Sequence, residues 1–142
     1  MECLVFKTVA RPRVTDKYIK DVVFFVLKKL KKKKGSLSVH LIGDHKMKSL
    51  NAIYRNKRQT TDVLSFAAQE GFPVRDTEEL GDIFISVPQI IRQAREYKIT
   101  HKEEMTRMLI HGILHLLGYD HIDKVDAKKM FIVQERFIKQ FV

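Results

Sequence analysis

Three histidines near the C-terminus have the spacing of metal ligands. They are His111, His115 and His121 in the sequence HGILHLLGYDH, with Gly118 between the second and the third. Two histidines four residues apart lie on one face of a helix. A glycine three residues later can adopt the left-handed conformation that ends a helix, so the chain can turn back towards the same point. Three converging imidazoles with a fourth position left open are typical of a catalytic zinc site.

The helix expected to carry these histidines is apolar around most of its circumference, which predicts a central, buried position. Its exceptions are Glu104, Arg107, His111 and His115, which are spaced by three, four and four residues. They form one polar stripe, so the two histidines lie on the face that must meet polar partners. A single histidine would more simply be a buried side chain bonded to the backbone. Asp120 fits either a partner that orients an imidazole or an ordinary turn residue.

The spacing HxxxHxxGxxH is also that of the metzincin zinc proteases, with one difference. Those enzymes carry a glutamate after the first histidine as general base, whereas this chain has Gly112. Glycine inside a helix costs about 1 kcal/mol relative to alanine, so a side chain is unwelcome at this position. Two explanations are open: Gly112 leaves room for substrate near the metal, or it allows close helix packing.

Composition restricts the class of protein. The chain has 142 residues, 44% of them hydrophobic, which predicts one globular domain spanning 1–142. It contains one cysteine, no apolar run long enough to cross a bilayer and no secretion signal, so we expect a cytoplasmic protein without a membrane partner. The net charge of +10 favours a polyanionic partner such as nucleic acid, although a basic soluble protein is an equal alternative on charge alone.

Hydrophobic periodicity and capping residues predict strands and helices that would position the histidines. We expect strands at 2–10, 37–43, 61–68 and 81–86, and helices at 15–34, 44–56, 88–97, 100–117 and 123–141. Asp44 is expected to cap the second helix, and Thr100 with Glu103 to form a capping box before the histidine helix. This order of elements predicts an α+β or α/β domain around a small mixed sheet.

Three segments together resemble the YbeY family of bacterial endoribonucleases. HGILHLLGYDH at 111–121 is similar to the signature of that family, LNAIYRNKRQTTDVLSF at 50–66 to a second family segment, and LGDIFIS at 80–86 to a third. The segments occur in the family's order, and the resemblance covers nearly the whole chain. It implies an α+β fold in which a mixed four-stranded sheet is packed with about five helices, with the metal site on a central helix. One departure concerns Ala67 and Ala68, where proline commonly follows TDVLSF; this affects the shape of the loop and not the chemistry.

The resemblance also implies a function and a set of site residues. His111, His115 and His121 correspond to the metal ligands, with one Zn²⁺ per chain, and Arg55 and His111 to the catalytic residues. The implied activity is single-strand-specific, zinc-dependent endonuclease cleavage of RNA in rRNA maturation, at the 3′ end of 16S rRNA, and in ribosome quality control. Ribosomal proteins and ribosome-associated GTPases are the implied protein partners.

Alternatives remain open on the residues themselves. Arg55, Lys57 and Arg58 could clamp a phosphate, because a guanidinium offers forked donors, or could form a solvated helix end. The lysines between 28 and 34 could follow an RNA backbone or be the basic end of a helix, favoured by its dipole. The rival functions are a ribosome assembly factor with a structural zinc and no turnover, and a zinc metallopeptidase. The general base stays unassigned.

Overall fold

A mixed sheet of four strands forms the centre of the protein. In the computed structural model, which describes residues 1–68, 79–119 and 123–141, the strands have the spatial order β1-β2-β4-β3. They are β1 (Glu2–Lys7), β2 (Ser36–Ile42), β3 (Val63–Ala67) and β4 (Glu79–Ser86). β1, β2 and β4 are parallel, and β3 runs antiparallel to β4. The four strands expected from the sequence are confirmed, with ends that differ by a few residues.

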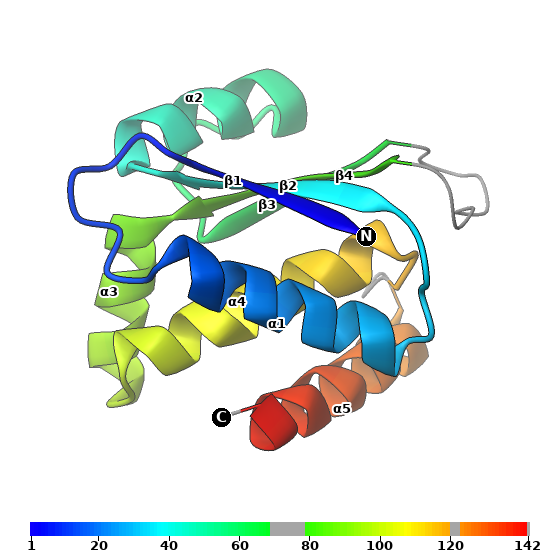
Figure 1. Ribbon diagram of the computed structural model, residues 1–142. Coiled ribbons are helices and arrows are strands. Elements are labelled where there is room, and N and C mark those ends of the chain that lie inside the picture. Colours follow the sequence, from blue (N-terminus) through cyan, green and yellow to red (C-terminus); the bar gives the residue numbers. More distant parts are fainter. Residues whose placement is uncertain (69–78, 120–122, 142) are drawn as a thin grey trace.

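Helices cover the two faces of the sheet unequally (Figure 1). The described residues form α1 (Asp16–Lys29), α2 (Asp44–Arg55), α3 (Val87–Tyr97), α4 (His101–Leu116) and α5 (Lys124–Phe141). α2 lies alone on one face, whereas α1 and α4 pack against the other and α5 packs on α4. This arrangement confirms the expected α+β architecture of a four-stranded mixed sheet with five helices.

The core lies between the sheet and the helices α1 and α4. Along β2, the alternate residues Leu37, Val39 and Leu41 are buried, because successive side chains of a strand point to opposite faces. α4 meets the sheet, α1, α3 and α5, so most of its circumference is apolar and buried, as its sequence predicts.

Both ends of α4 are set by the predicted residues. At the start, the Thr100 side chain accepts a hydrogen bond from the Glu103 N–H at 3.1 Å. At the end, Gly118 has φ of 97° and its N–H bonds to the His115 carbonyl, while the Tyr119 N–H bonds to the Leu114 carbonyl. This pair of bonds is a Schellman motif, which needs a positive φ that glycine adopts without strain. The chain therefore turns away from the helix at Gly118, three residues after His115.

Asp44 does not cap α2, contrary to our expectation. Gly43 occupies the N-cap position and makes no side-chain cap bond, while Asp44 is the first helical residue. The Asp44 carboxylate instead accepts hydrogen bonds from Arg92 at 2.8 and 2.9 Å and from Ser86 at 2.8 Å. The bonds from Arg92 are the main reason why the pKa of Asp44 is lowered. A tertiary ion pair between α2 and α3 thus competes successfully with the local cap.

Within the three described segments, no helix is both long enough and apolar enough to span a membrane.

Candidate metal centre

His111 and His115 point their imidazoles at each other from adjacent turns of α4. Their Nε2 atoms are 3.2 Å apart, and both side chains are half-buried. Two nitrogens at zinc-ligand distance from one tetrahedral ion lie roughly 3.3 Å apart, given Zn–N bonds of about 2.05 Å. The spacing of this pair therefore fits two ligands of a single zinc ion.

Gln134, on α5, determines which nitrogen of His111 can face a metal. The His111 Nδ1 atom lies 2.8 Å from the Gln134 Oε1 atom, and Gln134 is buried. The amide orientation follows from its other end, where Gln134 Nε2 donates to Glu135 at 3.2 Å. Because the amide oxygen can only accept, Nδ1 must carry the proton in neutral His111, and Nε2 keeps its lone pair. Histidine ligands of metals commonly have such a partner, which fixes the tautomer and the ring orientation.

The polar stripe predicted on α4 is confirmed, and its residues bind those of α3 and α5. Arg107 donates two hydrogen bonds of 3.1 Å to Glu135 and one of 3.3 Å to the buried Glu104. Glu104 also accepts a bond of 2.8 Å from Gln93 on α3. The bonds to Glu135 raise the pKa of Arg107. This network clamps α5 to α4 and so holds Gln134 beside His111.

The third predicted ligand, His121, and its neighbour Asp120 lie outside the described residues. Among the residues that the structure does describe, no group of three metal-binding side chains comes together. The two-histidine geometry fits zinc, and the three-histidine site stays a prediction. Both proposed roles of Asp120 stay open for the same reason.

Arg55 is linked to the histidine helix through one serine. Arg55 is exposed in the last turn of α2, and its Nη2 atom donates to the Ser65 carbonyl of β3 at 3.1 Å. The Ser65 hydroxyl in turn donates to the Gly112 carbonyl of α4 at 3.2 Å. Sequence reasoning did not single out Ser65, although a small polar residue on the helix-facing side of a strand is a usable signal. In the structure, Ser65 is thus the single residue that bridges Arg55 and the helix that carries His111.

Gly112 is explained by close packing and not by room for substrate. A Cβ atom at this position would lie 2.9 Å from Ile83 Cγ2 and 3.1 Å from Ser65 Oγ, both on the sheet. The glycine therefore faces β3 and β4, which lets α4 approach the sheet closely. Of our two explanations, the substrate pocket is wrong, and the close helix packing is confirmed.

Replacing Gly112 by alanine should destabilise the fold. The new methyl group meets the branched side chain of Ile83, which is fully buried and cannot move aside. Overpacking of this kind costs about 1–3 kcal/mol, partly offset by about 1 kcal/mol of better helix propensity. We expect a net loss of unfolding free energy in urea denaturation of the Gly112→Ala protein. Equal or higher stability would contradict the packing explanation.

A second prediction concerns Gln134. Gln134→Met keeps the length of the buried side chain but removes the oxygen that accepts from His111. Loss of such a partner typically weakens metal affinity about 10- to 100-fold, which competition with a chelating dye can measure. Thermal unfolding of the metal-free variant serves as the control, and it should stay close to that of the parent. Unchanged zinc affinity would show that Gln134 does not orient His111.

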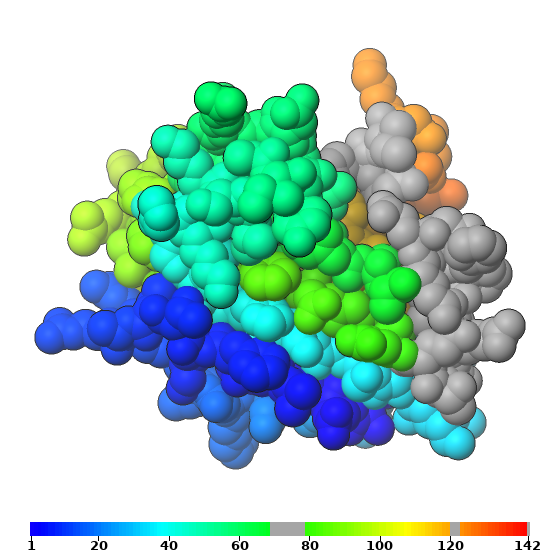
Figure 2. Space-filling view, turned by 90° about the horizontal axis from the view of Figure 1, so that it is seen from above, coloured from blue at the N-terminus to red at the C-terminus, as the bar shows by residue number. Residues whose placement is uncertain are grey.

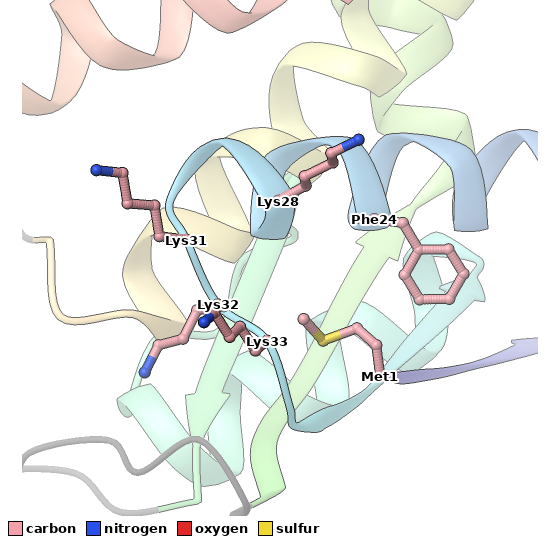
Figure 3. A pocket seen from close by; sticks show the side chains of 6 residues that line it. All are labelled: Met1, Phe24, Lys28, Lys31, Lys32 and Lys33. Atoms are coloured by element: carbon pink, nitrogen blue, oxygen red, sulfur yellow. The ribbon is translucent and has the colours of Figure 1, made fainter.

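The lysine cluster at the end of α1 lines a cavity that includes neither histidine of the pair. The cavity has a volume of about 540 Å³ and is lined by Met1, Phe24, Lys28, Lys31, Lys32 and Lys33 (Figure 3). α1 ends at Lys29, so the helix dipole favours only Lys28 and Lys29, which lie in its last turn. The side chains of Lys31, Lys32 and Lys33, which follow the helix, point in different directions (Figure 3). A role of this cluster in RNA contact stays a prediction.

Comparison with known proteins identifies relatives along nearly the whole chain. The family model described as "Endoribonuclease YbeY" matches residues 7–142. Curated proteins named Endoribonuclease YbeY include one from Sulfurihydrogenibium sp., 40% identical over 94% of this chain and 88% of the relative. Another, from Persephonella marina, is 38% identical over 96% of this chain and 90% of the relative.

The fold has a solved counterpart as well. The solution structure of a Thermotoga maritima protein aligns with a TM-score of 0.68 and 28% identity, covering 98% of this chain and 87% of its own. The match of the family model, the identity to curated members and the shared fold agree with the resemblance seen in the three sequence segments. The chain therefore belongs to the YbeY family of endoribonucleases.

Proposed function

We propose that this member of an endoribonuclease family cleaves single-stranded RNA with the help of one zinc ion held by His111, His115 and His121. One observation carries the metal part of the proposal. The Nε2 atoms of His111 and His115 are 3.2 Å apart, and the opposite nitrogen of His111 is bonded to Gln134. This geometry supports two zinc ligands, one of them with its tautomer already set.

The chain's own residues divide the work of cleavage. When bound, a zinc ion would lower the pKa of a water molecule to about 7 and would offer positive charge to a phosphoryl oxygen. His111 and His115 would hold the ion together with His121, and Gln134 would keep the His111 ring oriented. Arg55 presents an exposed guanidinium from the end of α2, which suits the scissile or a neighbouring phosphate because its charge is permanent. The general base is unassigned, and the nucleophile is either a water molecule or the 2′-hydroxyl of the RNA.

The substrate and partners follow from the family resemblance and from charge. The net charge of +10 favours a polyanion, and RNA is the substrate named for the relatives. We propose ribosomal RNA near the 3′ end of 16S rRNA as the target, in ribosome maturation and quality control in the cytoplasm. Ribosomal proteins and ribosome-associated GTPases are the proposed protein partners.

Metal removal tests the proposal. Elemental analysis of the purified protein is expected to give about one zinc ion per chain, as a single catalytic site requires. Dialysis against a chelator should abolish cleavage of a single-stranded RNA, and added zinc should restore it. Cleavage that survives complete removal of zinc would overturn the metal part and leave a metal-independent nuclease. A zinc-loaded protein that binds RNA without cleaving it would favour the assembly factor instead.

The metallopeptidase alternative is weakened at position 112. A zinc peptidase of the metzincin type needs a glutamate there, whereas Gly112 lies against Ile83 and Ser65 of the sheet, where no larger side chain fits. We expect no chelator-sensitive cleavage of an unfolded protein substrate.

A further inference from the structure

The sheet face opposite α4 carries a row of aromatic rings that reaches from α2 to the edge strand β1. One ring comes from each strand and one from α2. In spatial order they are Tyr54, Phe66, Phe84, His40 and Phe6. Successive ring centroids are 5.2, 5.8, 4.3 and 4.9 Å apart, so every ring touches the next. These ring–ring contacts explain why the side chains line up in a row. They do not explain why several of the rings are exposed to solvent.

Part of the row is open to solvent. Figure 2 looks down on this face and shows that α2 covers only a portion of the sheet, leaving atoms of β1, β2 and β4 at the surface. The two ends of the row are the most exposed, with Tyr54 at 61% and Phe6 at 48%, and Leu4 beside Phe6 is 47% exposed. Large exposed apolar groups gathered on one face mark an interaction surface.

The rings on β1, β2 and β4 stand upright on the sheet. Phe6, His40 and Phe84 are nearly coplanar, with interplanar angles of 17° and 13°, at spacings close to that between neighbouring strands. They therefore form a short column, stacked face to face across the strands. β1 is the edge of the sheet formed by the described residues, and none of the strands in that part of the chain covers the outer face of Phe6. A planar group placed there would continue the stack.

The other end of the row joins the proposed cleavage site. The Arg55 guanidinium lies 5.4 Å from the centre of the Phe66 ring, next to Tyr54. Arg55 is also bonded to Ser65, which is bonded to Gly112 on the histidine helix. Further exposed cations are carried by α2 and the turn that follows it: Lys46, Lys48, Lys57 and Arg58. The row thus starts beside Arg55, the residue proposed to bind phosphate, and these cations lie at its α2 end. Further along the row, the Asp82 carboxylate lies 3.3 Å from the His40 ring.

Exposed rings with cations beside them are typical of a surface that binds single-stranded nucleic acid. Bases stack on aromatic side chains while lysine and arginine contact the backbone phosphates. An apolar surface for a protein partner has no need of so many cations on one short helix. Duplex RNA does not fit the same surface, because its bases are already stacked on each other.

We propose that the aromatic row binds unpaired bases of the RNA that adjoin the phosphodiester cleaved at the metal centre. Tyr54 stacks on a base close to the phosphate at Arg55, and Phe6 stacks on a base several nucleotides away, beyond three strand spacings or about 14 Å. This inference rests on the proposed RNA substrate, and adds to it a subsite that explains the preference for single strands.

The experiment compares exposed aromatics on the row with equally exposed ones elsewhere. Tyr54→Ser and Phe6→Ser each remove one end of the row, whereas Tyr97→Ser and Phe131→Ser are matched controls at 59% and 61% exposure on α3 and α5. Tyr97 is an especially close match, because it too lies in the last turn of a helix that ends at a left-handed residue. None of these exposed side chains is needed for the core, and circular dichroism melts should verify this.

Affinity for a 2′-O-methyl oligouridine, which cannot be cleaved through its 2′-hydroxyl, is the readout in the zinc-loaded protein, at times too short for hydrolysis by water. The affinity of each row variant is expected to fall about five- to 150-fold, which corresponds to the loss of one base stacked on a ring. The affinity of the control variants should not change. For a short oligouridine that cannot reach β1, Tyr54→Ser should lower the affinity, whereas Phe6→Ser should leave it unchanged. Because the chain has no tryptophan, Tyr54→Trp adds a single tryptophan, whose selectively excited fluorescence RNA should quench, while the tryptophan of Tyr97→Trp should keep its fluorescence.

The outcomes separate this inference from the proposed function. If the parent protein cleaves RNA and both row variants bind the long oligouridine as tightly as the controls, the aromatic row is not an RNA subsite, and the nuclease proposal stands. If the parent protein neither binds nor cleaves single-stranded RNA, the proposed function fails and the inference fails with it. Equal losses in the row and control variants would also overturn the subsite, because they would show a general effect of surface aromatics.

Discussion

Replacing His115 by alanine is expected to abolish RNA cleavage and to leave the purified protein without stoichiometric zinc. His115 supplies one of the two nitrogens that lie 3.2 Å apart on α4, and the alanine variant keeps only one imidazole of that pair. The residual activity should fall to the level of the chelated parent protein. Elemental analysis and a cleavage assay on single-stranded RNA measure the two effects.

The matched control for this substitution is His101→Ala. His101 is the first residue of the same helix, more than two turns before His111, so it tests the loss of a histidine from α4 without touching the pair. It should keep both zinc and activity. If His115→Ala retained a full equivalent of zinc and normal cleavage, the histidine pair would not be the metal site.

Arg55→Ala is expected to have the second-largest effect, on activity and not on metal content. The guanidinium extends from the end of α2 and is linked through Ser65 to the helix of the histidines. Removing one well-placed donor to a charge that develops in the transition state costs about 10²–10³ in kcat. We expect a loss of that order in cleavage rate, with zinc content unchanged and unfolding free energy nearly so, because the side chain is exposed.

Two further variants separate charge from geometry at this position. Arg55→Lys keeps the charge but lacks the forked donors, so it should recover only part of the activity. Arg95→Ala removes an equally exposed arginine from the last turn of α3 and should cleave RNA normally. Unchanged RNA binding and cleavage in Arg55→Ala would exclude this residue from the mechanism.

Local interactions explain why the histidine helix could be predicted so well. Thr100 and Gly118 act on backbone groups within one turn of themselves, so their effect is visible in the sequence. The spacing of Glu104, Arg107, His111 and His115 likewise follows from the helical period alone. Asp44 shows the limit of this reasoning. Its sequence context predicts an N-cap, but its carboxylate is bound by Arg92, which lies 48 residues away in the sequence.

The residues that sequence reasoning missed all come from other elements of the fold. Gln134 lies 23 residues after His111 along the chain, and only the packing of α5 on α4 brings the two together. Ser65 acquires its role because β3 lies between α2 and α4, where it can accept from Arg55 and donate to Gly112. No spacing rule relates these positions, because their separation in sequence does not determine their distance in space.

The order of the residues determined the identity of the elements and the location of the histidine pair, since helical period and capping act over a few neighbouring positions. The metal-binding role predicted for the pair rests on the same spacing. The orientation of His111, the approach of Arg55 and the assembly of five rings into one row were decided only by the tertiary structure. Those features need strands and helices that are distant in sequence to pack in one arrangement, and this packing is a property of the whole core.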